Sequence, residues 1–461
     1  MKTFANLLRC NLSWCVLLRC SLSWCVLLRC TFSRSVLLRC VLLQCALCMC
    51  FAAPLHAELR TLRTRLLADA LAEQDGERPS MQRPFLYLDN GVVDGQDENN
   101  TLEISFDEMS HDVHFYTYTV CHLNADGNPS ALLSSEYLRG FTTMDITDYQ
   151  HSINTQRDYT HYRFNFPNED MQLLASGLYA LHIYEDGDRD KTIAWVPFAV
   201  VDPKVTIDAN AHSKTIKELN GHYQQVDIDV SMTDLVLRDP QEFTLVVRQN
   251  GRTDNAAILR QPTFVESKRL RYINHPSLVF EGGNEYRHFD AYSAYYAGTG
   301  IERIAYDNRD YHVLLFPDAP REGVYIHEYD VDGQYRVNAE RTSDPDTEAE
   351  YMWVHWLFVC EQPWFDGAVY VCGDLFDNEM SLRNRMQYDT EQGAYYLTSL
   401  VKQGGYDYQY RFLPKGERAA STLRTDGAYW QTQNEYTIYV FYRPFGARAD
   451  QLVGLQRLSS N

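Results

Sequence analysis

The chain has 461 residues and a mass of 53.5 kDa, with 62 acidic and 42 basic side chains and a formal net charge of −20. A chain of this length is too long for one ordinary domain, and its negative charge repels nucleic-acid phosphates, so no nucleic-acid partner is expected. Hydrophobic residues make up 45% of the sequence, which is enough to build cores and excludes global disorder.

Residues 1–57 form a leader that differs from the rest of the chain. The leader repeats a ten-residue unit, NLSWCVLLRC, SLSWCVLLRC and TFSRSVLLRC, and it contains 9 of the 12 cysteines and no acidic residue. The arginine in each unit interrupts the apolar stretch, which argues against a membrane-spanning helix. The uncharged run after Arg39 and the small residues up to Ala57 predict a secretory signal peptide cleaved after Ala57. We therefore expect a soluble exported protein with 36 basic and 62 acidic residues.

Three cysteines lie beyond the leader: Cys121, Cys360 and Cys372. They are too few and too scattered for a disulfide framework. Cys360 and Cys372 are close enough in sequence to form one disulfide, and two buried free thiols are the alternative that we favour.

Most of the remaining sequence predicts short β-strands. Alternating runs rich in β-branched and aromatic residues occur in TLEISF, HFYTYTV, HYRFNF, YALHIY, QQVDIDV and FTLVVRQ. Between such runs stand Asp-Gly and Asn-Gly steps, which are typical of type I′ hairpin turns because these turns need positive φ at both central residues. The steps are at residues 126–127, 186–187, 250–251, 332–333 and 426–427. Helical periodicity is nearly confined to residues 58–74, ELRTLRTRLLADALAEQ.

This pattern predicts an all-β fold of tandem immunoglobulin-like β-sandwich domains. Strands and helices do not alternate, which argues against a Rossmann sheet or a TIM barrel. Boundaries are predicted at VDPKV, near residues 202–204, and at the acidic segment SDPDTEAE, residues 343–350. We therefore expect a first sandwich over 58–202 with a short helical or irregular start, a second over 203–345 and a third over 346–461.

The sequence contains no local motif of the common enzyme classes. Neither G-x-S-x-G, H-E-x-x-H, a P-loop nor G-x-G-x-x-G occurs. Asp186, Asp188 and Asp190 resemble the start of a calcium loop, but Lys191 and Pro197 stand where that loop needs glycine and glutamate. We interpret this segment as a solvated hairpin turn and the acidic residues 94–98 as a polar loop. We predict no catalytic residue, no metal site and no cofactor.

Histidines and tyrosines are interpreted mainly as structural residues. His122, His161 and His288 have no common metal-ligand spacing, so we expect hydrogen-bonded structural roles. All 32 tyrosines lie beyond the leader. Their alternation in strands predicts packing on sheet faces, with binding to a sugar or a protein as the alternative.

A series of unusual segments begins at His122. It runs through HLNADGNPS, EYLRGF, DYQHSINT, YTHYRFNFPNED and SGLYALHIYEDGD. These segments resemble the first domain of the type IX secretion system plug protein. The resemblance continues through RQNGRTDNA and GGNEYRHFD to YVCGDLF, LVKQGGYDYQYRF, YWQTQNEYTIYVFYRP and DQLVG, and so covers nearly everything after the leader.

The resemblance implies an exported protein on the periplasmic side of a giant outer-membrane translocon barrel, whose pore it occludes when no cargo is present. The barrel is then the expected partner and the only route to membrane association, and no small-molecule ligand is expected. The motif residues are assigned either a structural role or a partner contact. They are His122, Asn124, Asp126, Pro129, Ser130, Tyr137, Gly140, Asn154, Thr155, Tyr159, His161, Tyr162, Pro167, Asn168, Asn250, Gly251, Asn284, Glu285, Arg287 and Asp290.

The chain departs from the family pattern in its first motif. Leu123 and Gly127 stand where the family has cysteine and tryptophan in H-C-N-A-D-W-x-P-S. If the tryptophan site belongs to the core, its loss removes a few kcal/mol of burial that neighbouring residues must replace.

The segment from about Tyr351 separately resembles a glycogen-binding-like immunoglobulin-type module. In that module a tryptophan after the G-x-F turn stacks on sugar rings, whereas here Asp377 and Asn378 follow Phe376. The resemblance implies a retained fold without sugar binding. A periplasmic or surface glycan-binding protein is therefore the alternative to the plug, and a β-sandwich hydrolase is a third, weaker hypothesis.

Overall fold

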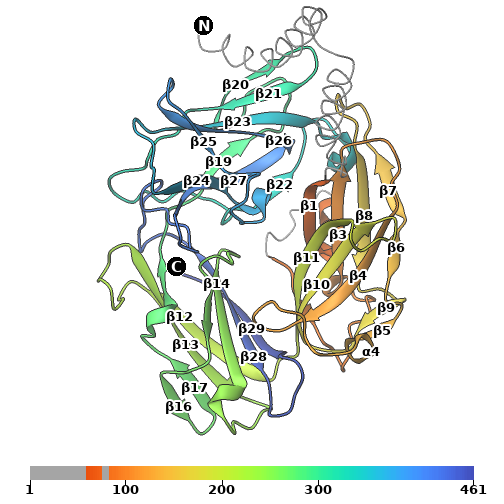
Figure 1. Cartoon of the computed structure of the whole chain (residues 1–461), viewed down its shortest axis with the longest axis vertical. Helices are drawn as coiled ribbons and strands as arrows, with labels where there is room; N and C mark the ends of the chain where they lie inside the picture. The colour runs from red at the N-terminus through yellow and green to blue at the C-terminus, as the bar shows by residue number, and fades with distance from the viewer. Residues whose placement is uncertain (1–58, 75–82, 461) are drawn as a thin grey trace, which may run out of the picture. The chain divides into compact units, whose positions relative to one another are not determined.

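A computed structural model describes residues 59–74 and 83–460, which belong to one compact unit, Leu59–Asn461 (Figure 1). The predicted leader, its repeats and its cleavage site lie outside the described residues. The predicted all-β class is confirmed, because the described chain consists of β-sandwiches with only short helices.

The first sandwich contains two main sheets. The four-stranded sheet has the order β1 (Leu59–Leu66), β3 (Leu102–Glu108), β8 (Thr160–Phe166) and β7 (Asp148–His151). The five-stranded sheet has the order β2 (Leu86–Tyr87), β11 (Thr192–Val201), β10 (Gly177–Glu185), β4 (Tyr116–Leu123) and β6 (Met144–Ile146). A small ribbon joins β5 (Leu138–Gly140) and β9 (Met171–Leu173), and short helices are α3 (Leu67–Gln74), η2 (Glu98–Asn100) and α4 (Ser134–Tyr137).

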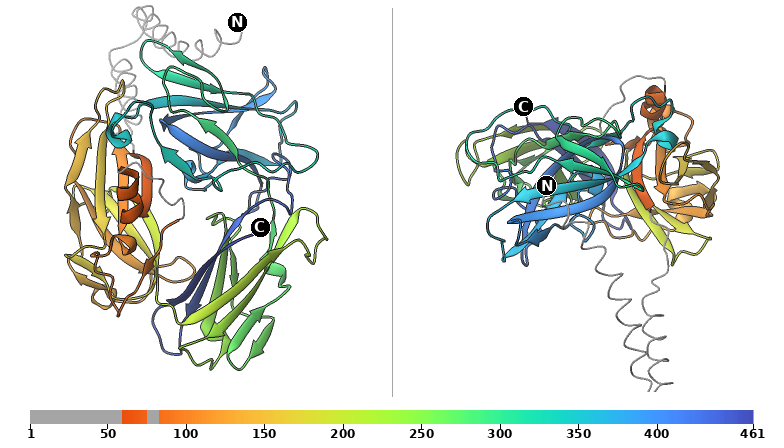
Figure 2. Two further views of the ribbon diagram at one scale, coloured as in Figure 1. Left: turned by 180° about the vertical axis from the view of Figure 1, so that it is seen from behind. Right: turned by 90° about the horizontal axis from the view of Figure 1, so that it is seen from above.

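The predicted helix over residues 58–74 is correct only in its second half. Residues 59–66 form β1, and α3 follows directly, lying beside β1 (Figure 2). A bulge between Arg60 and Arg63 shifts the register of β1 on β3, with Thr61 at φ +49°. This register places Arg63 beside Asp346, so pairing to the free edge of β3 outweighs the local helical pattern.

The second sandwich is built from two separate parts of the chain. One sheet contains β12 (Val205–His212), β13 (Tyr223–Met232), β17 (Arg269–Tyr272) and β16 (Phe264–Glu266), with β18 (Val279–Glu281) also paired to β13. The other sheet has the order β15 (Ala257–Leu259), β14 (Phe243–Gln249), β28 (Glu435–Tyr442) and β29 (Gln451–Ser459). Two 3₁₀ turns complete it, η3 (Pro240–Glu242) and η4 (Pro276–Leu278).

The third sandwich lies between these two parts in sequence. One sheet contains β19 (Arg287–Asp290), β27 (Gly404–Pro414) and β22 (Tyr335–Val337), with β24 (Gly367–Cys372) also paired to β27. The other has the order β20 (Ile301–Tyr306), β21 (Tyr311–Leu315), β23 (Tyr351–Val359), β26 (Ala394–Lys402) and β25 (Gln387–Asp389). The short helices are α5 (Pro345–Glu348) and η5 (Asp374–Phe376).

This strand pairing corrects the predicted division at residues 345 and 346. β28 pairs with β14, and β29 pairs with β28, so the last two strands complete the second sandwich. In turn, β19 and β21 pair with β27 and β23, which lie beyond the predicted boundary. The physical reason is burial: Ile438 and Val440 of β28 lie in the core of the second sandwich beside Leu245. The acidic segment at 343–350 is therefore part of the third sandwich and not a linker.

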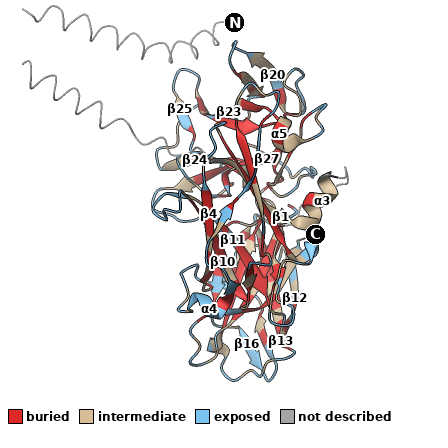
Figure 3. Cartoon of the chain, turned by 90° about the vertical axis from the view of Figure 1, so that its right-hand side faces the viewer, coloured by how far each residue is buried: buried red, intermediate tan, exposed pale blue. Residues whose placement is uncertain are grey.

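Burial departs from the predicted alternation, because β3 is buried along its whole length and β10 everywhere except at Leu178 and Glu185. Red, buried residues run along β4, β10 and β11, whereas β16 is exposed (Figure 3). The core of the third sandwich surrounds Trp356, whose ring centroid lies 5.9 Å from that of Phe289. Cys121, Cys360 and Cys372 are all free thiols, and only Cys372 is fully buried.

Three of the five predicted turn steps have positive φ at both residues. They are the steps at 186–187, 250–251 and 332–333. At 126–127 and 426–427 only the glycine has positive φ. Asp426 is buried and accepts a hydrogen bond from the N–H of Tyr410 at 2.9 Å, so its position is determined by packing and not by a hairpin.

Candidate functional site

The loop after β4 carries the first motif residues. His122 is buried, its Nε2 lies 3.1 Å from the carbonyl oxygen of Ser176, and burial lowers its pKa. The Asp126 carboxylate accepts a hydrogen bond from the N–H of Asn128 at 3.0 Å, which closes the turn. The N–H of Ser130 donates to the carbonyl of His122 at 2.9 Å. These polar side chains therefore determine the shape of their own loop.

The same loop packs on the second sandwich at what we call the first junction. The N–H of Ala125 donates to Asp450 Oδ2 at 2.9 Å, and Asn124 Oδ1 accepts from the N–H of Asp450 at 3.3 Å and from Arg443. An apolar seam lies alongside, consisting of Ala125, Ala199, Val201, Val246, Phe441 and Leu452. The motif residue Asn124 thus joins the first sandwich to the second.

A buried charged cluster joins the first and third sandwiches at the second junction. Lys402, at the end of β26, has a fully buried side chain whose Nζ lies 2.6 Å from Asp107 Oδ2 on β3. The same Nζ donates to the carbonyl oxygen of Asp346 at 2.6 Å. His161 Nδ1 lies 2.6 Å from Asp107 Oδ1, and the Tyr351 hydroxyl donates to Asp107 Oδ2 at 2.7 Å. One carboxylate therefore binds three side chains from two sandwiches.

Aromatic rings surround this cluster and exclude water from it. The ring centroid of the motif residue Tyr159 lies 4.2 Å from Lys402 Nζ, and its hydroxyl donates to the carbonyl oxygen of Ala349 at 2.9 Å. Burial lowers the pKa of Lys402, against the opposing effect of the Asp107 carboxylate. Burial alone would raise the pKa of Asp107, but Lys402 and His161 outweigh it and lower that pKa.

The loop between β7 and β8 extends the second junction. Asn154 has φ +61°, and the Thr155 hydroxyl donates to the carbonyl oxygen of Arg157 at 2.8 Å. Arg157 Nε donates to Asp310 Oδ1 of the third sandwich at 2.8 Å. The backbone N–H of Arg157 donates to Glu350 Oε1 at 3.3 Å. Both motif residues therefore shape a loop that contacts the neighbouring sandwich.

The third junction holds the second and third sandwiches together. Arg252 donates to the carbonyl oxygen of Ala420 at 2.7 Å. Beside it, Asn284 Nδ2 donates to the carbonyl oxygen of Asp426 at 2.8 Å, and Arg287 Nε donates to Asp426 Oδ1 at 2.8 Å. The motif residues Asn284 and Arg287 thus hold the segment through which the chain returns to the second sandwich.

The motif pair Asn250 and Gly251 lies at the same junction. Asn250 Nδ2 donates to Asn434 Oδ1 at 2.8 Å. A Cβ on Gly251 would lie 2.4 Å from Nε of Arg83, a side chain that also binds Asp374 of the third sandwich at 2.8 Å. A glycine is needed here because its φ is +69° and because Arg83 occupies the adjacent space.

Most of the other motif residues stabilise single sandwiches, and Glu285 also accepts from the N–H of Gln433 at 3.4 Å, just before β28. Glu285 is buried and accepts from the Tyr325 hydroxyl, while Asp290 Oδ1 lies 2.8 Å from His288 Nε2. Hydrogen bonds to Asp407 and Asp290 raise the pKa of His288 to about 9. The motif residues whose contacts lie within the first sandwich are Pro129, Ser130, Tyr137, Gly140, Tyr162, Pro167 and Asn168.

Gly140 provides a test of this local packing. Its φ is +100°, and a Cβ there would lie 2.0 Å from the carbonyl oxygen of Asp170, whereas Gly127, with φ +81°, has nothing within 4 Å. We expect Gly140→Ala to lower the free energy of unfolding by about 3 kcal/mol and Gly127→Ala by about 1 kcal/mol. Denaturant titration of the two variants measures this difference, and equal losses would contradict the described backbone contact.

Two carboxyl groups before β22 give a pH-dependent test. Burial, together with nearby carboxylates, raises the pKa of Asp330 and of Asp332 to about 7 each. The folded chain therefore keeps protons that the unfolded chain loses between about pH 4 and about pH 7, and the free energy of unfolding falls as the pH rises through this window. Above the window the two charged groups remain destabilising.

We expect Asp332→Asn to raise the free energy of unfolding at about pH 8 by about 2 kcal/mol, with little effect at about pH 4. Oδ1 of Asp332 has no hydrogen-bond partner among the described residues, so the substitution breaks no hydrogen bond at that atom. Denaturant titrations at both pH values measure the effect, with Glu302→Gln on exposed β20 as the control. Equal effects of Asp332→Asn at the two pH values would contradict the raised pKa.

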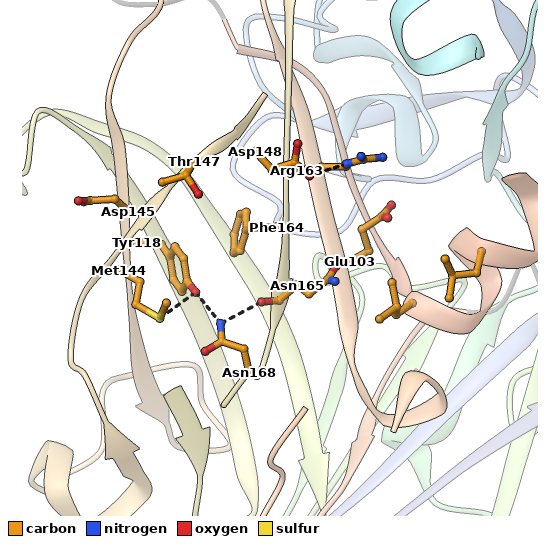
Figure 4. A pocket seen from close by; sticks show the side chains of 12 residues that line it. Glu103, Tyr118, Met144, Asp145, Thr147, Asp148, Arg163, Phe164, Asn165 and Asn168 are labelled. Atoms are coloured by element: carbon orange, nitrogen blue, oxygen red, sulfur yellow. Dashed lines mark hydrogen bonds and ion pairs between the residues drawn. The ribbon is translucent and has the colours of Figure 1, made fainter. Parts of the chain in front are cut away.

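A groove opens on the first sandwich, with a volume of about 440 Å³ (Figure 4). The Tyr118 ring stacks on Phe164 with centroids 4.5 Å apart, and Asn168 Nδ2 donates to the Tyr118 hydroxyl at 3.0 Å. At the rim, Arg163 Nε donates to Asp148 Oδ2 at 2.8 Å. These polar groups of the groove are therefore hydrogen-bonded to one another.

Within 59–74 and 83–460, no group of three or more histidine, cysteine, aspartate or glutamate side chains could hold a metal ion. In the same part of the chain, no helix is long and apolar enough to cross a membrane.

Sequence reasoning missed the centre of the second junction. Three residues of this centre stand at or near the ends of strands: Asp107 in SFDE, Lys402 in LVK and Tyr351 in EYMW. Polar and charged residues are common at strand ends, so these three did not stand out. Their partners are distant in sequence, so no spacing links them. Asp107 is one of several polar residues in β3, LEISFDE, so its burial could not be read from the strand pattern.

Comparisons with known proteins agree with this architecture. The family model described as "Type 9 secretion system plug protein 1st domain" matches residues 89–202. A crystal structure of a hypothetical protein from Parabacteroides merdae ATCC 43184 is 35% identical and has a TM-score of 0.80, covering 87% of this chain and 97% of that one. Residues 89–202 belong to the family of type 9 secretion system plug protein first domains. No curated protein matches it.

The part of the chain that matches the plug protein family contributes residues to two of the three junctions. The family match ends at residue 202, and the predicted first domain ends at the same position. It contains the motif residues of the first and second junctions, including Asn124, Tyr159 and His161. The family and the all-β fold favour a secretion-related role without catalysis.

Proposed function

We propose that this chain is a non-enzymatic plug subunit of the type IX protein secretion system that occludes the periplasmic side of the outer-membrane translocon pore. The match of residues 89–202 to the first domain of the plug family carries this proposal. A very wide barrel encloses an aqueous lumen, and an open lumen would leak solutes across the outer membrane. Blocking such a lumen requires a stable body of suitable size and no chemistry.

The three junctions support this role. At each junction, side chains of one sandwich form hydrogen bonds or ion pairs with another, and at the second junction Lys402 and Asp107 are fully buried. Buried, hydrogen-bonded contacts of this kind resist separation of the sandwiches. A body held in this way can block a pore, whereas sandwiches on flexible linkers would move aside.

The proposed partner is the outer-membrane barrel of the type IX translocon. The protein would be exported, would reside in the periplasm at the inner face of the outer membrane, and would associate with the membrane only through the barrel. A plug needs no cofactor, metal or small-molecule ligand. The net charge of −20 also disfavours a nucleic-acid partner.

Outer-membrane permeability tests the proposal. We expect deletion of the gene to increase uptake of a dye that the outer membrane normally excludes, and the intact gene to restore exclusion. Deleting the barrel as well should abolish the increase, because the open pore is then absent. Unchanged dye uptake in the single deletion would contradict occlusion.

A further inference from the structure

A long segment between β21 and β22 contains no strand, and its two ends are firmly held. At the first end, the N–H of Asp318 donates to the carbonyl oxygen of Leu357 at 2.8 Å, and the N–H of Arg321 donates to the carbonyl oxygen of Thr425 at 2.9 Å. At the other end, the N–H of Val331 donates to Asp407 Oδ2 at 2.6 Å. We call residues 322–330, between these anchors, the strap.

The backbone of the strap is unpaired. Among the described residues, no backbone group of 322–330 forms a hydrogen bond with another backbone group. Side-chain contacts hold the strap in place, because the Tyr325 hydroxyl donates to the buried carboxylate of Glu285 and the Tyr429 hydroxyl donates to the carbonyl oxygen of Gly323 at 3.0 Å. The strap is therefore held in place while most of its backbone donors and acceptors remain available.

Apolar side chains of the strap point away from the sandwich. Val324 is 85% exposed, Ile326 67% and Tyr329 95%, whereas Tyr325 between them is partly buried against Glu285. Over residues 324–326 the side chains alternate outward and inward, as in a β-strand at the edge of a sheet, whereas all three residues from 327 to 329 are exposed. An unpaired edge with exposed apolar side chains is a template for strand addition by another chain.

Charge around the strap favours a basic occupant. Glu322 and Glu328 are exposed on the strap. Arg321 is the nearby cation, and its guanidinium already lies 3.3 Å from Glu328. The excess of carboxylates would attract lysine or arginine side chains and repel an acidic segment.

We propose that the strap is a docking edge to which an extended segment of the translocon barrel, with alternating apolar residues and basic flanks, adds as a β-strand. This inference rests on the proposed plug function and names the surface through which it acts. Main-chain hydrogen bonds supply affinity in this binding mode, and Val324, Ile326 and Tyr329 supply the side-chain contacts.

Photo-crosslinking in cells tests the docking edge. A photoreactive amino acid is placed at Ile326 and, as the matched control, at Phe264, which is 57% exposed on edge strand β16 of the second sandwich. We expect a crosslink to the barrel from position 326 and none from position 264. Crosslinking of 326 to a second copy of this chain, or of 264 alone to the barrel, would overturn the docking edge.

A proline substitution provides a second readout. Ile326→Pro removes an N–H that a paired strand would use, and it should reduce recovery of the barrel with the tagged full chain by about tenfold while the thermal unfolding midpoint stays unchanged. Unchanged recovery would overturn the docking edge and leave the plug function standing. Failure of the unsubstituted chain to recover any barrel would instead contradict the plug function itself.

Discussion

Replacing Lys402 by methionine is expected to destabilise the folded chain by about 4 kcal/mol. The substitution keeps an unbranched side chain that is one atom shorter and removes the cation that binds Asp107 at 2.6 Å. Asp107 is 1% exposed, so its carboxylate would remain buried with only His161 and Tyr351 as partners. Denaturant titration of the purified chain, followed by tryptophan fluorescence, measures the loss.

Lys191→Met is the matched control for this effect. Lys191 Nζ also lies 2.6 Å from an aspartate, Asp186, but both side chains are about half exposed. Water screens that pair, so we expect a loss of less than about 1 kcal/mol. Similar losses for Lys402→Met and Lys191→Met would contradict a buried ion pair at the second junction.

The second large effect is expected from Arg287→Met. Arg287 binds both Asp318 and Asp426, and the Asp426 side chain is fully buried. Removing the guanidinium leaves two neighbouring carboxylates without their main cation, which should cost about 3 to 4 kcal/mol. Denaturant titration measures this loss, and hydrogen exchange should show faster opening of the segment around Asp426.

Arg424→Met is the control for this second prediction. Arg424 lies 2.8 Å from Asp366, but about half of each side chain is exposed. We expect a change of less than about 1 kcal/mol. If Arg287→Met is as mild as Arg424→Met, the third junction does not depend on this cluster.

Local patterns predicted the elements of the fold better than their pairing. Period-two alternation in HYRFNF and YALHIY correctly predicted β8 and β10. The Asn250-Gly251 step correctly predicted a turn with positive φ at both residues. The return of β28 to β14 was missed because the strands are separated by the whole third sandwich, and no local pattern specifies a partner so distant.

The candidate site was predicted only in part, for a similar reason. Motif segments singled out Tyr159, His161 and Asn284, and these residues lie at junctions. The sequence could not show that His161 and Lys402 bind the same carboxylate, because they are held together only by the packing of two sandwiches. Residues 59–66 were misread because their leucines fit a helix locally, while the open edge of β3 stabilises a strand.

Affinity purification from gently solubilised envelopes tests the central claim most directly. The account predicts that the tagged full chain recovers a very large outer-membrane barrel in near-equal amount, identified by mass spectrometry. As an internal comparison, Ile326→Pro should lose the barrel and Lys191→Met should retain it. Elution of the unsubstituted chain alone, with no barrel protein, would contradict the claim that this chain is the plug of a translocon.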